Sequence, residues 1–167
     1  MNLPFEFLNA FWFILPAYFA SLSPVWFRLR GKTPLDMGKT FRGKPILGPS
    51  KSVKGFLGGA FCGTLLGGLQ QFVFGKPNGL LLGLLLGFGA MTGDAVKSFF
   101  KRQRDMPPGS SWFPFDQLDF VIGALVFASV IELPTIFGII VLLVLTPPLH
   151  LMSNIIHHRV GIKEVPH

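Results

Sequence analysis

Residues 79–102 read GLLLGLLLGFGAMTGDAVKSFFKR, an apolar, glycine-rich run that passes directly into a charged segment. The apolar part is long enough to enter a membrane, and ionisable residues at such a place are costly and usually functional. On a helix, Asp94, Lys97, Ser98 and Lys101 share one face, because their offsets are three, four and seven. One stripe therefore carries an acid, a hydroxyl and two cations at the edge of an apolar segment.

A second pair of acids, Asp116 and Asp119, begins the next apolar run, three residues apart. If the two apolar segments are neighbours, as the short loop between them favours, the pair comes close to Asp94. Magnesium prefers hard oxygen ligands and keeps water or substrate phosphate in its shell. We therefore predict that Asp94, Asp116 and Asp119 hold Mg²⁺. The alternative is that each acid only pairs with a neighbouring Lys or Arg.

The composition predicts a polytopic membrane protein. Half of the 167 residues are hydrophobic and 14% are charged, which is too apolar for an ordinary soluble domain. No secretory signal is expected, because the first residues lack a basic segment. The net charge of +7 lies in loops, so an anionic membrane surface or a polyphosphate explains it without a nucleic-acid partner. The single Cys62 excludes an internal disulfide.

We expect an all-α protein forming a single integral membrane domain over residues 1–167, with two functional loops at about 28–54 and 101–117. Glycines recur every four residues from Gly55 to Gly67, a spacing that lets helix backbones approach closely. Close packing is the favoured interpretation, and room for a lipid chain is the alternative. The expected membrane spans are about 5–27, 55–74, 79–100, 118–133 and 135–152.

The distribution of cations predicts the orientation. Of the Lys and Arg residues, fourteen fall in the two long loops, their flanks and the tail, and only Lys76 falls on the opposite side. The positive-inside rule then places the N-terminus outside and both loops and the C-terminus in the cytoplasm. The chemistry is expected at the cytoplasmic face of the cell membrane.

Several cations are candidate phosphate ligands. Ser98, Lys101 and Arg102 could hold a polyphosphate, although cations at a helix end also serve as interfacial anchors. Gly38-Lys39-Thr40 is similar to the end of a P-loop, but Thr33 stands where that motif needs a glycine, so a P-loop hydrolase is rejected. What remains is a basic segment suited to folding over an anionic ligand, or to lipid-surface contact, with Lys39, Arg42, Lys51 and Lys54.

Together these motifs resemble the CTP-dependent phosphatidate cytidylyltransferase family. Gly93-Asp94-x-x-x-Ser98-x-x-Lys101-Arg102, followed by Asp105 and Asp116-x-x-Asp119, is similar to its S-x-x-K-R, K-D and D-R-x-D signature. The first loop resembles the archaeal branch, the CDP-archaeol synthases, over residues 36–43 (DMGKTFRG) and 47–55 (LGPSKSVKG). The resemblance covers about a third of the chain. Gln117 replaces the Arg between the paired acids, Lys97 stands where an acid is common, and Pro49-Ser50 replaces Asp-Gly.

The resemblance implies transfer of CMP from CTP to an isoprenoid ether lipid phosphate, giving a CDP-activated lipid and pyrophosphate. It implies Mg²⁺ on Asp94, Asp116 and Asp119, with Asp94, Asp116 and Lys101 as catalytic residues. No protein nucleophile is needed, because the lipid phosphate is itself an anionic nucleophile. The implied substrate-binding residues are Lys39, Thr40, Arg42, Lys51, Lys54, Lys97, Ser98, Arg102 and Asp105.

Two rival functions stay open at this point. A CDP-alcohol phosphotransferase also clusters aspartates at a membrane face, but its D-G-x-x-A-R run is absent from the sequence. A transporter of an anionic substrate would predict internal repeats, and the two loops here differ in length and sequence. The oligomeric state does not follow from the sequence.

Overall fold

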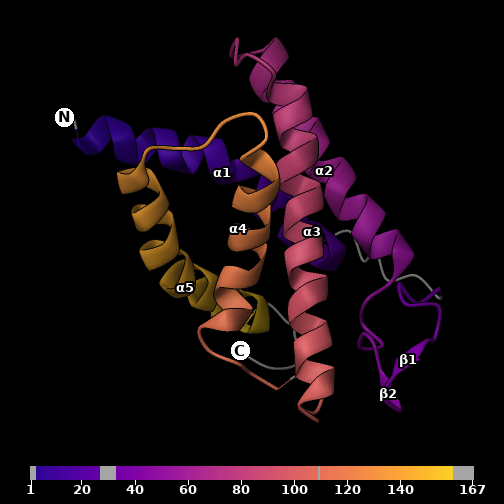
Figure 1. Cartoon of the computed structure of the whole chain (residues 1–167). Helices are drawn as coiled ribbons and strands as arrows, with labels where there is room; N and C mark the ends of the chain where they lie inside the picture. Colours follow the sequence, from indigo (N-terminus) through magenta and orange to yellow (C-terminus); the bar gives the residue numbers. More distant parts are fainter. Residues whose placement is uncertain (1–2, 27–32, 109, 160–167) are drawn as a thin grey trace.

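The protein is seen here as a computed structural model that describes residues 3–26, 33–108 and 110–159. The described residues form five α-helices and one short β-hairpin (Figure 1). The expected all-helical architecture is therefore confirmed, with the hairpin as an addition. Three loop cations counted for the orientation, Arg28, Arg30 and Lys32, lie outside the described residues. The elements are α1 (Leu3–Trp26), β1 (Thr40–Phe41), β2 (Lys44–Pro45), α2 (Val53–Phe72), α3 (Gly79–Gln103), α4 (Phe115–Ala128) and α5 (Ile136–Arg159).

Three of the helices are long and apolar enough to cross a membrane: Leu3–Pro24 within α1, all of α3, and Ile136–Ser153 within α5. The other two helices fall short of these criteria. Helix α2 is rich in glycine, which lowers its hydropathy, and α4 has 14 residues. Because the hydrocarbon core is about 30 Å thick and a helix rises about 1.5 Å per residue, α4 by itself is shorter than a full crossing.

Helix boundaries differ from the expected spans mainly around α4. This helix begins at Phe115, ahead of the expected 118, with Asp116 in its first turn where the helix dipole favours an acid. It ends at Ala128, ahead of the expected 133. The Ser129 hydroxyl donates to the Val126 carbonyl oxygen at 2.7 Å, and the backbone then turns. Helix α5 continues past the expected 152 to Arg159, with Pro147 and Pro148 inside it.

Glycines hold α2 directly against α3. A Cβ added at Gly67 would lie 2.2 Å from the Gly79 carbonyl oxygen, and one added at Gly63 would lie 2.7 Å from the Gly87 Cα. Real Cβ atoms do not come that close, so the two backbones touch only because both sides lack side chains. The predicted packing role of the glycine ladder is confirmed.

A second glycine contact joins α3 to α4 and sets the position of the acids. A Cβ at Gly93 would lie 2.1 Å from the Asp119 carbonyl oxygen, and one at Gly123 would lie 2.2 Å from the Gly89 carbonyl oxygen. The middle of α3 and the middle of α4 are therefore in backbone contact. This contact brings Asp119 level with the charged end of α3.

The first loop contains a hairpin that the sequence did not predict. Thr40 pairs with Pro45 and Phe41 with Lys44, and the two turn residues, Arg42 and Gly43, have φ of 52° and 77°. Positive φ at both central residues is the pattern of a two-residue type I′ hairpin. Such turns usually carry Asn-Gly, so the Arg42-Gly43 pair did not predict a hairpin.

Hydrogen bonds also order the described part of the first loop on either side of the hairpin. The two Asp36 carboxylate oxygens accept from the Gly38 and Leu47 backbone N–H groups at 3.0 and 2.8 Å. The Leu35 N–H donates to the Lys51 carbonyl oxygen at 2.9 Å, which closes the loop. Ser52 then caps α2 by accepting from the Gly55 N–H at 3.1 Å. The loop thus ends at a fixed place beside α3.

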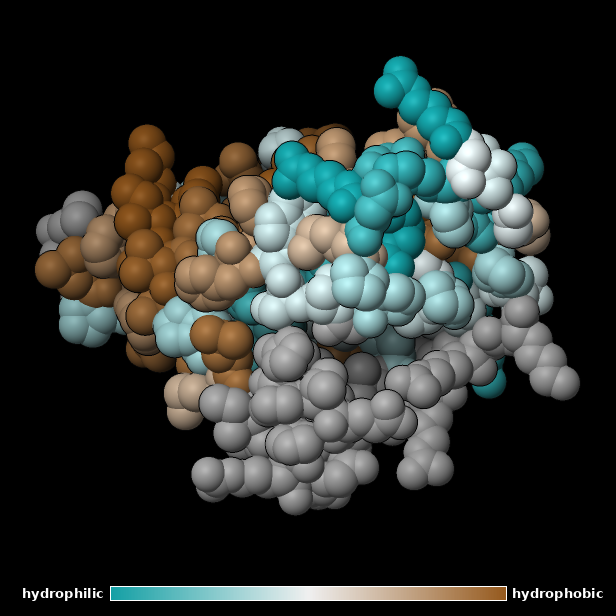
Figure 2. All heavy atoms as spheres, turned by 90° about the horizontal axis from the view of Figure 1, so that it is seen from below, coloured by the Kyte–Doolittle hydropathy of each residue, from teal (hydrophilic) through white to brown (hydrophobic). Residues whose placement is uncertain are grey.

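Hydrophobic contacts bring α1, α3, α4 and α5 together around one core. Buried residues of that core include Ile14, Leu86, Phe120 and Leu142, all at most 2% exposed. Seen from the end where α3 finishes, hydrophilic residues gather on the side of the hairpin and hydrophobic ones on the other side (Figure 2). On this face, hydrophilic residues therefore gather beside the hairpin (Figure 2).

Candidate active site

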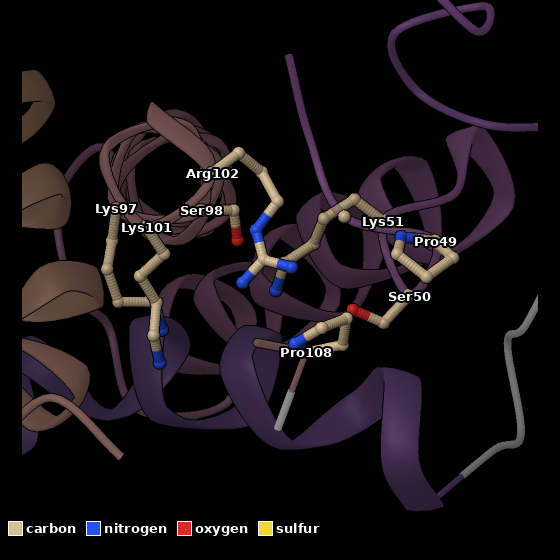
Figure 3. A pocket seen from close by; sticks show the side chains of 9 residues that line it. Pro49, Ser50, Lys51, Lys97, Ser98, Lys101, Arg102 and Pro108 are labelled. Carbon is tan, nitrogen blue, oxygen red and sulfur yellow. The ribbon is translucent and has the colours of Figure 1, made fainter. Parts of the chain in front are cut away.

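A polar hollow of about 120 Å³ lies between the last turns of α3 and the segment that leads into α2. Four of its lining residues are cations, and Ser98 adds a hydroxyl. Lys97 and Lys101 leave α3 toward the same side, whereas Arg102 reaches across the hollow toward Lys51 (Figure 3). The lining residues are Gly48, Pro49, Ser50, Lys51, Lys97, Ser98, Lys101, Arg102 and Pro108.

The three predicted carboxylates meet at a single ammonium group. The Lys97 Nζ lies 3.1 Å from Asp94 Oδ1, 3.4 Å from Asp116 Oδ1 and 2.6 Å from Asp119 Oδ2. Asp94 and Lys97 are three residues apart on α3, and the α3–α4 glycine contact brings the other two acids to them. The Lys97 side chain is only 15% exposed, so the ion pairs are partly shielded from water.

A second lysine, Lys101, fixes Asp116 more tightly. Its Nζ lies 2.8 and 2.9 Å from the two Asp116 carboxylate oxygens, and it also donates to the Ser110 carbonyl oxygen at 2.5 Å. The Trp112 N–H donates to Asp116 Oδ2 at 2.5 Å. Burial opposes ionisation of Asp116, but the hydrogen bond from Lys101, the charge of Lys97 and the Trp112 N–H together lower its pKa below the ordinary value.

Asp94 lines a second, smaller hollow and has a partner from the first loop. The Lys51 Nζ pairs with Asp94 Oδ2. Lys51 and Ser50 line both the hollow beside Arg102 and a smaller one of about 60 Å³, which Asp94 lines together with the apolar Phe56 and Met91. The closed first loop therefore delivers a cation to the acid predicted from α3.

Arg102 is the cation of the hollow without an acid partner among the described residues. Its Nε is buried and has no hydrogen-bond partner there. A Cβ added at Gly48 would lie 3.9 Å from the Arg102 Nη1, so the guanidinium group reaches the first loop. A buried donor without a partner is costly, which points to an acceptor supplied from outside the protein.

The donor set fits a hard divalent ion by its chemistry, because carboxylate oxygens from two helices converge on one positive centre. In the described part of the chain, however, no group of three or more Asp, Glu, His or Cys side chains is arranged to hold a metal. The acids are instead paired with lysines. The assignment of Mg²⁺ stays a prediction.

The other predicted substrate-binding residues lie away from this hollow. Lys39, Thr40 and Arg42 are exposed on the hairpin, and Lys54 is exposed in the first turn of α2. Asp105 follows α3 with a φ of 56° and pairs with Lys44 from the hairpin strand β2. None of these lines the hollow, so their contact with substrate stays a prediction.

The structure adds site residues that the sequence did not single out. Gly48, Pro49 and Ser50 line the hollow, and the Lys51 N–H donates to the Gly48 carbonyl oxygen at 3.0 Å to close a turn there. Pro49-Ser50 was noticed only as a departure from a motif. The Gly-Pro pair was a turn signal, but the sequence could not say which helix the turn would face.

Comparisons with known proteins give matches over nearly the whole chain. The family model described as CarS-like, CDP-archaeol synthase, matches residues 3–167. The CDP-archaeol synthase of Pyrococcus furiosus is 44% identical over 164 residues, covering 95% of this chain and 97% of that protein. The one of Methanocaldococcus jannaschii is 39% identical, covering 92% and 93%. A solved structure of an intramembrane enzyme for archaeal membrane lipid biosynthesis superimposes with a TM-score of 0.81 at 31% identity, covering 89% of this chain and 94% of the other.

Proposed function

The chain belongs to the CDP-archaeol synthase family, and from this membership we propose that the hollow beside Arg102 receives the triphosphate of CTP. The protein is a membrane enzyme of lipid biosynthesis that forms a CDP-activated archaeal lipid from CTP and a lipid phosphate. The sequence left three functions open: a cytidylyltransferase, a CDP-alcohol phosphotransferase and a transporter. Membership of the CDP-archaeol synthase family selects the cytidylyltransferase.

The observation that supports this site is the juxtaposition of a cationic hollow with three carboxylates. A triphosphate carries several negative charges, and the hollow offers Arg102, Ser98 and three lysines within one small volume. Arginine presents a planar fork of donors that suits phosphate oxygens, and lysine acts as a point charge. The buried, unpartnered Arg102 Nε is a donor to which a phosphate oxygen would bind.

In the reaction, an oxygen of the lipid phosphate attacks the α-phosphorus of CTP. The bond from that phosphorus to the bridging oxygen breaks, and pyrophosphate leaves. The attacking oxygen is already anionic at neutral pH, so no protein base has to remove a proton. The contribution of Arg102, Ser98 and Lys101 is then to hold the phosphates in position and to offset the charge that develops on the leaving group.

Asp94, Asp116 and Asp119 are the residues that would hold Mg²⁺. When bound there, the ion would offset charge on the triphosphate. What supports this assignment is the convergence of the three carboxylates on one cation, together with the fact that Lys97, which they share, lines the hollow. Lys51 would lie between the metal site and the triphosphate, because it pairs with Asp94 and also lines the hollow.

For the membrane we propose five crossings, with the N-terminus outside and the site facing the cytoplasm. Helices α1, α3 and α5 have the length and apolarity for this. Helix α2 is bound to α3 by the glycine contact, and α4 by the second one, so both would follow α3 into the bilayer. The excess of cations beside the hollow and in the first loop supports the orientation.

The test uses purified protein in detergent with labelled CTP, Mg²⁺ and an isoprenoid glycerol phosphate. We expect equal amounts of pyrophosphate and of a CMP-bearing lipid. Asp94→Asn and Asp116→Asn should each abolish turnover while the protein stays folded by thermal unfolding. Lys76→Met, which removes an ion pair with Glu132 away from the site, should leave turnover unchanged. Full turnover in either aspartate variant would reject the metal assignment.

A further inference from the structure

The unusual feature of this site is that a protein cation already occupies the common centre of the three acids. Lys97 Nζ lies within 3.4 Å of an oxygen of each of them. With Lys51 and Lys101, the three acids face three ammonium groups, so this cluster is electrically balanced by the protein alone. An entering dication therefore meets a site with no net negative charge to attract it.

Lys97 also lines the hollow beside Arg102. It lines that hollow together with Ser98, Lys101 and Arg102. A lysine has a flexible four-carbon stem with a compact charge at its end. The same ammonium group can therefore serve the carboxylates in one rotamer and a phosphate in another, without movement of α3.

We propose that Lys97 is a built-in stand-in for the metal, which a divalent ion displaces from the three carboxylates and which then binds the nucleotide's phosphates. This inference rests on the proposed metal and CTP sites. It makes Lys97 a positioning residue that couples the two ligands. A metal ion bound to any two of these carboxylate oxygens would compete for them with the Lys97 ammonium group. Because both are positively charged, the ion would repel the ammonium group from the acids.

The coupling has a definite direction. Without a nucleotide, the displaced ammonium group would be left in a partly buried place, with Arg102 and Lys101 as neighbours and no new acid. That is unfavourable, so metal alone binds weakly. With a triphosphate in the hollow, the displaced charge gains a partner. Metal and CTP should therefore bind with positive cooperativity, and each should raise the affinity for the other by the same factor.

The same geometry predicts what Lys97 does for the protein without ligands. Removing the ammonium group leaves Asp94, Asp116 and Asp119 to repel one another, although Lys51 and Lys101 still pair with two of them. Lys97→Met should therefore lower the unfolding temperature of the metal-free protein. A divalent ion should restore it, because the ion takes the place that Lys97 held.

The experiment measures the unfolding temperature of the detergent-solubilised protein against free Mn²⁺, with and without CTP and with no lipid present. For wild type we expect a weak response to Mn²⁺ alone and a much lower midpoint concentration with CTP. For Lys97→Met we expect the midpoint without CTP to fall by about tenfold or more, about 1.4 kcal/mol, and the additional effect of CTP to shrink. Lys76→Met is the matched control, since it also loses one half-buried lysine from an ion pair and should keep the wild-type midpoint.

The outcomes separate this inference from the function on which it rests. If Lys97→Met shows the wild-type midpoint without CTP, or a higher one, the stand-in role is overturned while the metal site survives. If wild type shows no response to Mn²⁺ with CTP present, the metal site and the stand-in role are both overturned. Should Lys97→Met not yield folded protein, Lys97→Gln carries the same expectations.

Discussion

Gly93→Ala should inactivate the enzyme by separating α3 from α4, although the substitution adds one methyl group and removes no charged side chain. The added Cβ would lie 2.1 Å from the Asp119 carbonyl oxygen, 2.9 Å from the Asp119 carbonyl carbon and 3.3 Å from the Gly123 Cα. All three are backbone atoms, so no side-chain rotation can relieve the contact. The helices themselves must move apart.

The size of the movement follows from ordinary contact distances. Van der Waals contact of a Cβ begins at 3.4 Å, so a gap of about 1.3 Å has to open against the Asp119 oxygen. A shift of that size takes Lys97 and Asp116, now 3.4 Å apart across the same two helices, out of ion-pair distance. Overpacking costs about 1–3 kcal/mol, offset by about 1 kcal/mol from the better helix propensity of Ala. A displacement of about 1 Å at an active site costs about a hundredfold in rate.

The assay is turnover of CTP and lipid phosphate at saturating substrate, together with the unfolding temperature in detergent. Gly68→Ala is the matched control: it makes the same change in α2, where the new Cβ would meet only the terminal Leu80 Cδ1 at 3.1 Å. We expect Gly68→Ala to keep full turnover and Gly93→Ala to lose about a hundredfold while remaining folded. A Gly93→Ala enzyme within about threefold of wild type would falsify the claim that backbone contact sets the site.

Three further predictions concern the nucleotide, pH and the membrane. Arg102→Lys should raise KM for CTP about tenfold and leave KM for the lipid unchanged, because the guanidinium fork is lost while the charge stays; a rise for the lipid alone would place Arg102 elsewhere. Since the pKa of Asp116 lies below its ordinary value of about 3.9, its carboxylate stabilises the fold above about pH 4, and that contribution is lost as pH falls through the lower folded pKa. Asp116→Asn should therefore flatten the fall in unfolding temperature between pH 6 and pH 3, and an equally steep fall would contradict this. In a Cys62→Ala background, an impermeant maleimide added outside right-side-out vesicles should label Pro77→Cys but not Lys39→Cys, and the reverse pattern would invert the proposed orientation.

Contacts between residues a few positions apart in the sequence, or between helices joined by a short loop, could be predicted from the sequence. The helical offsets from Asp94 to Lys101 need only the 3.6-residue repeat, and the structure does place Asp94 and Lys97 in contact, at 3.1 Å. The glycines at every fourth position predicted the α2–α3 contact for the same reason. The approach of Asp116 and Asp119 to Asp94 also followed, because a short loop joins their helices.

Pairing between distant segments was not readable. Nothing local in Lys51 indicates Asp94, 43 residues further on, as its partner. The pair Arg42-Gly43 does not predict a hairpin either, because Arg stands where Asn or Asp is usual in such a turn. The end of α4 at Ala128 was missed because Val130, Ile131 and Leu133 continue the apolar run. Hydropathy by itself does not register the hydrogen bond from Ser129 that accompanies the turn.

The sequence by itself determined that this is a helical membrane protein of the cytidylyltransferase type, with its acids and cations at one edge of the apolar segments. The membrane and helical character follows from composition and helical period, which depend on residues a few positions apart. The cytidylyltransferase type follows from the resemblance of the loop and helix motifs to that family. Only the tertiary structure decided which cation meets which acid, and it placed Lys97 where three carboxylates converge. This pairing of cations with acids depends on the backbone contact of Gly93 with α4 and on the closed first loop. Both arise from packing between segments that are distant in the sequence, and local sequence patterns do not say which of the possible contacts forms.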